Sequence, residues 1–188
     1  SRAARTLTPE QVERARRIVY QSRLGSNVER SAIELLREVV GDIPLVGGSA
    51  VGLITGKGAT LTGFECGLLM FGATLAPQTI VTVGGLDRDE CETGRRLGNI
   101  LRASCQSNPT ILLFYDSIHS ASPPQLHVGS RLMEGLYEGL GELKPTLIGA
   151  GTLGDMAMET SFIFDGREAR KHAVVAVVMP EGLASHVQ

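Results

Sequence analysis

A group of polar side chains that could bind a ligand directly follows the most apolar central segment of the sequence. Asp116, Ser117 and His119 come after the run 110–115, which is typical of a strand covered on both faces. Ligands of α/β sheets bind beyond the carboxyl ends of such strands. Asp116 could accept a hydrogen bond from an amine or hydroxyl, and His119 could donate one, change charge near neutral pH or bind a metal. The alternative is an ordinary turn, because Asp and Ser side chains favour turns.

Two glycine-rich stretches form a second candidate site. The chain contains 23 glycines, and Leu45–Gly52 aligns with Leu147–Gly154. Each stretch follows an amphipathic segment that ends in glycine, at Gly41 and Gly141. We interpret them as two copies of one turn in a duplicated chain, with room for backbone to approach a ligand. The alternative is that glycine lets two sheets, or a sheet and a helix, pack closely.

The predicted ligand site combines both glycine stretches with the segment after the central strand. Side chains supply polar contacts there, and glycines expose backbone N–H groups. The candidate ligand-binding residues are Gly47, Gly48, Ser49, Asp116, Ser117, His119, Gly149, Gly151, Thr152 and Asp155. We predict no catalytic residue, no cofactor and no metal ligand, except His119 if the chain binds haem.

Known catalytic and nucleotide-binding motifs give no enzyme class. Gly149–Gly154 matches G-x-G-x-x-G, but 155–160 is too short for the helix that a dinucleotide site requires. Gly56–Gly58 lacks the Ser or Thr of a P-loop, and Gly48–Val51 lacks the second glycine of a nucleophile elbow. The four histidines are dispersed along the sequence.

Composition excludes several classes of protein. A net charge of −2 and few aromatic residues argue against a nucleic-acid partner. Three cysteines without C-x-x-C spacing argue against a disulfide framework and a structural zinc site. No apolar run reaches about 18 residues, and no signal peptide is visible. We therefore expect a cytoplasmic protein without a membrane partner.

Hydrophobic periodicity then predicts the elements that position these residues. We expect a helix beginning at Thr8 and Pro9, and further helices over 28–40, 87–104 and 126–140. Strands are expected over 43–50, 66–71, 79–83, 110–115, 145–150, 161–164 and 172–179, with 52–63 a loop or irregular hairpin and 117–124 a loop.

This order predicts an α/β fold of α+β-like character. Internally duplicated αβββ units, at about 28–85 and 126–182, would surround a mixed sheet with covering helices. We expect residues 1–26 to form an N-terminal leader and helix, and 27–188 to form a single domain.

The order of these motifs resembles the N-terminal FIST domain family over about residues 29–182. The segments that carry the resemblance are Leu45–Ala50, Thr110–Phe114, Pro145–Asp155, Thr160–Gly166 and Ala173–Val177. The resemblance implies a sensory input domain that binds small molecules such as amino acids. It also implies signalling partners such as kinases, chemoreceptors or cyclic-nucleotide enzymes, and some members look like haem-based nitric oxide sensors. The family usually carries a companion domain, so we expect the output on other sequence.

The function predicted first is a non-enzymatic sensory domain that binds a small ligand and signals to a partner protein or companion domain. Three alternatives stay open: a haem-based gas sensor with His119 as ligand, a hydrolase or transferase using Ser49 or Thr152 in a glycine-lined site, and a structural or protein-interaction domain. The sequence leaves the ligand, the partner and the oligomeric state open.

Overall fold

The computed structural model describes residues 7–23, 32–61, 66–105 and 107–180 of the chain. Helix α1 (Pro9–Arg23) begins where the sequence predicts. The N–H of Gln11 donates to Thr8 Oγ1 at 3.2 Å, and the N–H of Thr8 donates to Gln11 Oε1 at 2.9 Å. This reciprocal pair is a capping box, which satisfies two backbone donors at the helix start. The predicted boundary between residues 26 and 27 lies outside the described residues.

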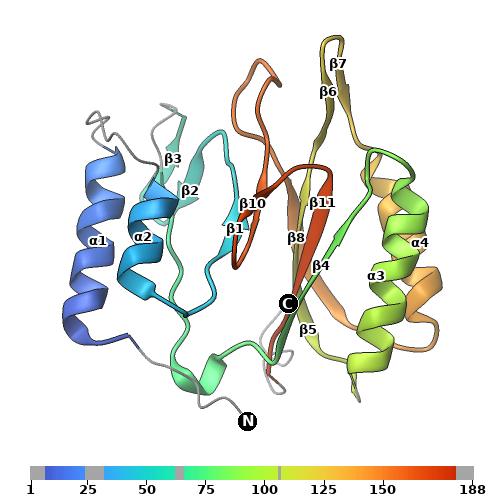
Figure 1. Cartoon of the computed structure of the whole chain (residues 1–188), viewed down its shortest axis with the longest axis horizontal. Coiled ribbons are helices and arrows are strands. Elements are labelled where there is room, and N and C mark those ends of the chain that lie inside the picture. The colour runs from blue at the N-terminus through green and yellow to red at the C-terminus, as the bar shows by residue number, and fades with distance from the viewer. Residues whose placement is uncertain (1–6, 24–31, 62–65, 106, 181–188) are drawn as a thin grey trace.

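A four-stranded mixed sheet forms the centre of the molecule (Figure 1). Its order is β4 (Thr79–Gly84), β11 (Ala173–Val178), β5 (Thr110–Asp116) and β8 (Thr146–Thr152). Strand β11 is antiparallel to β4 and to β5, whereas β5 and β8 are parallel. Strands β4, β5 and β8 therefore run in the same direction. All six residues of β11 are buried, as expected for a central strand covered on both faces.

Helices α3 (Glu90–Ser104) and α4 (Gly129–Leu140) cover one face of this sheet (Figure 1). Their leucines recur at helical spacing and form the main apolar core with side chains of the sheet. The fully buried leucines of the two helices are Leu97, Leu101, Leu132, Leu136 and Leu140.

Four buried glycines let α3 and α4 approach each other through their backbones. They are Gly94 and Gly98 on α3 and Gly135 and Gly139 on α4. A Cβ at any of them would overlap a carbonyl oxygen of the facing helix. A glycine inside a helix costs about 1 kcal/mol relative to alanine, and this close contact explains why the helices carry them.

A second, smaller sheet covers the other face of the central sheet. Its order is β1 (Val46–Gly48), β9 (Ile163–Asp165) and β10 (Ala169–Arg170), with both pairings antiparallel. Ile163 of β9 packs on Val175 of β11, which joins the two sheets through apolar contact.

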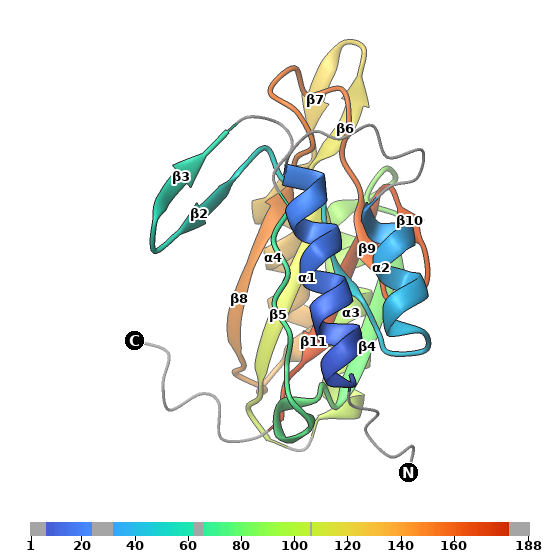
Figure 2. The ribbon, with the colours of Figure 1, turned by 90° about the vertical axis from the view of Figure 1, so that its left-hand side faces the viewer.

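Helices α1 and α2 (Ala32–Val40) lie beyond the small sheet, on the opposite side from α3 and α4 (Figures 1 and 2). Ala15 and Ile18 of α1 pack on Leu36 and Val39 of α2. Within the described part of the chain, no helix combines the length and the apolar sequence needed to cross a membrane.

Two hairpins project from the body of the molecule (Figure 2). Strands β2 (Leu53–Thr55) and β3 (Gly58–Thr60) form the first, which confirms the hairpin alternative predicted for this region. Strands β6 (Ile118–Ala121) and β7 (Pro124–Leu126) form the second. The loop predicted over 117–124 was therefore wrong, because the chain pairs with itself directly after β5.

The predicted α/β fold is confirmed, but one predicted strand is wrong. The described residues 66–72 form no strand, and a 3-10 turn, η1 (Ala73–Leu75), follows them. Leu69 is 75% exposed, and this apolar run takes no part in the sheet β4–β11–β5–β8. The segment was a predicted strand of the first αβββ unit, and the internal duplication is not confirmed.

We expect Gly135→Ala to lower the free energy of unfolding by about 1–3 kcal/mol, the usual cost of overpacking. Its Cβ would overlap the carbonyl oxygen of Cys91, which is backbone and cannot rotate away. Urea unfolding followed by circular dichroism measures the change. Glu134→Ala, at the exposed neighbouring position, is the control and should change stability by less than about 0.5 kcal/mol. A Gly135→Ala variant as stable as the wild type would contradict the close helix contact.

Candidate functional site

One edge of the central sheet gathers the chemically active side chains. Because β4, β5 and β8 run in the same direction, they end at this edge, at Gly84, Asp116 and Thr152. We call it the carboxyl-end edge. Helices α3 and α4 both begin there (Figure 1). Ligand sites of α/β proteins form at such edges.

The ten candidate residues occupy three neighbouring segments at or near the carboxyl-end edge. Gly47 and Gly48 lie in β1 with Ser49 directly after it; Asp116 ends β5, Ser117 follows, and His119 lies in β6; Gly149, Gly151 and Thr152 lie in β8, with Asp155 in the turn beyond it. Backbone hydrogen bonds join the three segments: Leu153 N–H donates to Ser49 O at 3.2 Å, and Ser117 N–H donates to Thr152 O at 3.3 Å.

Asp116 is a buried carboxylate, with only 1% of its surface exposed. Its Oδ2 accepts the backbone N–H of His172 at 2.6 Å, and its Oδ1 accepts the N–H of Ile118 at 3.2 Å. The side chain therefore ties the end of β5 to the start of β11. Recognition of a ligand by Asp116 stays a prediction.

Three histidines from different segments of the chain meet at this edge. His119 comes from β6, His127 from the residues before α4, and His172 from the residue before β11. The Nε2 of His127 lies 3.0 Å from the Nδ1 of His172. The ring centroids of His119 and His127 are 5.0 Å apart, and those of His119 and His172 are 6.3 Å apart.

The backbone of His172 is fixed from both sides. Its φ of 51° is in the left-handed region, which residues other than glycine rarely adopt. Its N–H is bound by Asp116, and its carbonyl oxygen accepts the N–H groups of Gly85 and Leu86, each at 3.0 Å. These bonds hold the imidazole of His172 beside His127.

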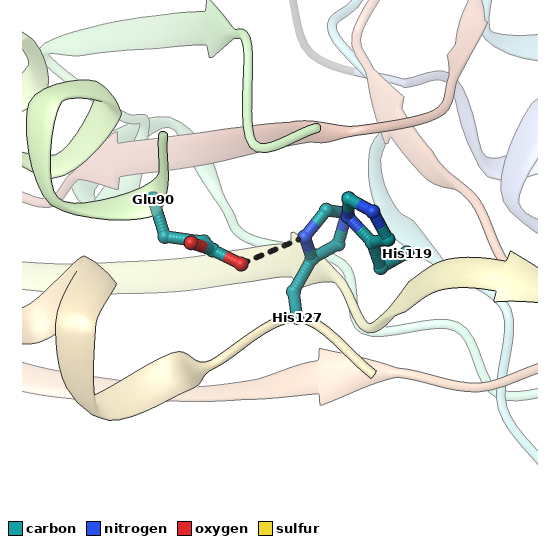
Figure 3. Close-up of side chains that lie close together, drawn as sticks. All are labelled: Glu90, His119 and His127. Carbon is teal, nitrogen blue, oxygen red and sulfur yellow. Dashed lines mark hydrogen bonds and ion pairs between the residues drawn. The ribbon is translucent and has the colours of Figure 1, made fainter. Parts of the chain in front are cut away.

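Glu90, the first residue of α3, completes the cluster (Figure 3). Its Oε1 lies 3.3 Å from the Nδ1 of His127 and accepts the N–H of Val128, also at 3.3 Å. The residue is held in place by the helix start, where Asp89 caps α3 by accepting the N–H of Glu92. We call Glu90, His119, His127 and His172 the histidine cluster.

The cluster shifts the pKa values of two of its members. Burial lowers the pKa of His127, the hydrogen bond with Glu90 opposes this, and electrostatic interaction with the neighbouring imidazoles of His119 and His172 lowers the pKa further. Burial raises the pKa of the Glu90 carboxyl, but hydrogen bonds from its own N–H, from Val128 and from His127 outweigh burial and hold the pKa below its ordinary value. The pair therefore favours a neutral imidazole beside a carboxylate.

The two glycine stretches do meet, and close packing accounts for several of their glycines. A Cβ at Gly48 would overlap the side chain of Thr152 and lie 2.8 Å from the carbonyl oxygen of Phe162. A Cβ at Gly149 would overlap the carbonyl oxygen of Leu113. The alternative of close backbone approach thus explains Gly48 and Gly149, whereas Gly47 has open space at its Cβ position.

The hydroxyl groups in these stretches bond to neighbouring protein groups. Ser49 Oγ accepts the N–H of Phe162 at 3.1 Å. Thr152 Oγ1 donates to the carbonyl oxygen of Tyr115 at 3.2 Å and lies 3.1 Å from Ser161 Oγ. These contacts fasten β8 and the 161–162 segment to the edge, and ligand contacts by Ser49 and Thr152 stay a prediction.

A hollow of about 460 Å³ opens at the end of β4 and the start of α3. Charged side chains of both signs and glycine backbone line it. The lining residues are Gly84, Gly85, Asp87, Arg88, Asp89, Glu92, Thr93 and Arg96. None of the ten candidate residues lines this hollow.

Sequence reasoning missed three members of the histidine cluster, Glu90, His127 and His172, because it treated the four histidines as dispersed. The sequence did contain one indication of the cluster, which is the position of its members relative to the predicted elements. Glu90 begins a helix, His127 shortly precedes one, and His172 immediately precedes the last strand, so each lies at an element boundary. Only the parallel alignment of β4 and β5 brings these boundaries together.

The surroundings of His119 do not fit a haem group. A porphyrin bound to a histidine needs a wide, mostly apolar slot. The rings of His127 and His172 lie beside His119 instead, and Glu90 adds a carboxylate within 4.8 Å of the ligand atoms of His119 and His127. This donor set suits a bare metal ion better than a porphyrin.

We expect Asp116→Asn to lower the free energy of unfolding by about 1–3 kcal/mol. The new amide group would face one of the two N–H donors, of His172 or Ile118, and leave it without an acceptor. Urea unfolding measures the loss. Asp87→Asn, an exposed carboxylate at the same edge, is the control. Equal stability of the two variants would show that the Asp116 bonds do not hold this edge together.

Asp155 gives a pH-dependent prediction. The N–H of Glu159, and then the hydroxyl and N–H of Thr160, hold the pKa of the Asp155 carboxyl below its ordinary value. The ionised form therefore stabilises the fold above the unfolded-state pKa of about 3.9, and the contribution is lost as pH falls through the lower folded-state pKa. Asp155→Asn should flatten the decline of the urea midpoint below about pH 4. Glu159→Gln is the control, and parallel profiles for Asp155→Asn and the wild type would overturn the assignment.

Comparison with known proteins gives one family. The model of the FIST N domain matches residues 18–187, nearly the whole chain. No curated protein and no solved structure matches the chain significantly. The matched region contains β1, β5, β8, β9 and β11, on which the earlier resemblance rested. The chain therefore belongs to the FIST N domain family.

Proposed function

We propose that this FIST N domain is a non-enzymatic sensory domain that binds a small ligand at the carboxyl-end edge and signals to a partner protein or companion domain. The family is one of sensory domains in signal transduction. The observation that carries the location is the shared edge: β4, β5 and β8 end there, α3 and α4 begin there, and the hollow opens there.

An amino acid is the ligand class that the hollow fits best. An amino acid carries a carboxylate and an ammonium group, so it needs a cation and an anion at short separation. Arg88 and Arg96 offer guanidinium groups that bind carboxylates in a bidentate manner. Asp87 is an exposed carboxylate on the same lining, suited to the ammonium group.

The position of the hollow supports a way for ligand binding to affect helices α3 and α4. Its lining comes from the end of β4 and the first turns of α3, and α3 is packed backbone to backbone on α4. A ligand that binds one arrangement of this edge more tightly than another shifts the population toward that arrangement.

Exposed apolar side chains in and after the β2–β3 hairpin support a partner interface. Ile54 of β2 is 89% exposed, and Leu61 and Leu69 are 73% and 75% exposed. All three lie within residues 54–69 of the sequence, and exposed apolar side chains are typical of protein interaction sites where they form a contiguous patch. A cytoplasmic signalling protein or a companion domain is the partner that we propose for this region.

The contacts of the candidate nucleophiles support a non-enzymatic role. A serine or threonine nucleophile needs a base within hydrogen-bond reach. The hydroxyl groups of Ser49 and Thr152 instead contact backbone groups and, for Thr152, the hydroxyl of Ser161.

A thermal-shift screen of the twenty amino acids tests the proposal. A ligand at one hundred times its Kd stabilises a protein by about 2.7 kcal/mol, which corresponds to about 5–11 °C for a chain of this size. We expect at least one amino acid to give such a shift, and Arg96→Ala to abolish it. Arg102→Ala, on the last turn of the same helix, is the control and should retain it. If no amino acid raises the melting temperature, the amino acid proposal fails.

A further inference from the structure

Three side chains of the histidine cluster bring metal-ligating atoms together from three separate elements. Glu90 begins α3, His119 lies in β6 and His127 shortly precedes α4 (Figure 3). One ligand atom from each lies within 4.8 Å of the other two. The two histidines lie on either side of the β6–β7 hairpin, whereas Glu90 is distant from them in the sequence, so the fold brings the carboxylate to the imidazoles.

The distance between the ligand atoms of Glu90 and His127 already matches the distance between two ligands of a zinc ion. Zinc binds nitrogen and oxygen ligands at about 2.0–2.1 Å, so two ligands of a tetrahedral ion lie about 3.3 Å apart. The distance from Glu90 Oε1 to His127 Nδ1 is 3.3 Å. His119 needs to approach by about 1.5 Å at most, which a side-chain rotation provides.

The second nitrogen of His127 has the partner that a metal-bound histidine requires. Ligating histidines usually donate their other N–H to an acceptor, which fixes the tautomer and the ring orientation. With a metal on Nδ1, the Nε2–H of His127 donates to the Nδ1 of His172, 3.0 Å away. Asp116, Gly85 and Leu86 fix the backbone of His172, so His172 is a positioning residue.

We propose that Glu90, His119 and His127 form a binding site for one divalent transition-metal ion, with Zn²⁺ as the first candidate. Two imidazole nitrogens and one carboxylate oxygen are a common ligand set for this class of ion. Three protein ligands leave a coordination position open for water or a small ligand. The inference is independent of amino acid binding in the hollow, because Glu90, His119 and His127 do not line the hollow.

The charges around the site explain why a carboxylate is needed in it. The N-termini of α3 and α4 lie at the same edge, and the positive ends of their dipoles oppose a cation. The carboxylate of Glu90 offsets this directly, and the nearby carboxylate of Asp116 adds negative charge. Glu90→Gln keeps the shape of the side chain and removes this compensation, which makes it the sharpest variant.

Zinc titration of the whole 188-residue chain, stripped of metal with a chelator, tests the proposal by isothermal calorimetry. We expect one Zn²⁺ per chain. Glu90→Gln and His119→Ala should each weaken binding by about tenfold to hundredfold or more, since even the loss of an outer hydrogen-bond partner costs this much. Glu134→Gln, an exposed carboxylate on α4 outside both the histidine cluster and the hollow, is the matched control and should bind as the wild type does.

Co²⁺ absorption distinguishes the proposed ligands from the cysteines. Nitrogen and oxygen ligation gives visible bands without the near-ultraviolet charge-transfer band of a thiolate, which Cys91 or another cysteine would produce. His172→Ala should shift the visible bands and weaken binding about tenfold, while its circular dichroism spectrum stays that of the wild type. A thiolate band, or equal Zn²⁺ affinity of folded Glu90→Gln, His119→Ala and wild type, would overturn the site, as would a wild type that binds no Zn²⁺.

Discussion

The hydrogen bond from the His172 N–H to the buried Asp116 carboxylate is the contact on which the carboxyl-end edge depends. It joins the end of β5 to the start of β11, and the carbonyl oxygen of His172 then receives two N–H groups from the end of β4. One residue thus ties three adjacent strands at one edge. A positive φ at His172 persists because these bonds over-determine its backbone.

The starts of α3 and α4 follow from this anchoring. The turn after β4 leads through Leu86 into α3, so the position of Glu90 depends on where His172 holds Gly85 and Leu86. The N–H of His127 donates to the carbonyl oxygen of Ser117 at 2.8 Å, which places the chain before α4 against the end of β5. The histidine cluster is therefore a consequence of how the strands end.

Local sequence patterns predicted most elements and candidate residues at two of the three strand ends of this edge, those of β5 and β8. The apolar run before Asp116 identified β5 and its carboxyl end, because a buried strand is visible in a single window of sequence. The grouping of Glu90, His127 and His172 was not visible, since it results from strand order and direction. The wrong strand at Cys66–Phe71 has a related cause: its residues are apolar, but which apolar segments enter the sheet is decided by strand pairing, and this segment is not among the four strands.

The abundance of glycine also acquired a different meaning in the structure. The stretches around Gly48 and Gly149 were interpreted as access for a ligand, and the fold shows backbone and side chains in close contact at both. Gly94 and Gly98 on α3, and Gly135 and Gly139 on α4, have the G-x-x-x-G spacing of close helix pairs, but the sequence does not show which helix each pair faces. Their importance appears only when the two helices face each other.

That helix contact makes α3 and α4 one mechanical unit. Where backbone touches backbone, no side chain lies between the helices to change rotamer and absorb a displacement. With 15 residues, α3 spans about 22 Å. We expect a small shift of its first turn to move the two helices together as far as Ser104 and Leu140, at the opposite end of the sheet from the carboxyl-end edge.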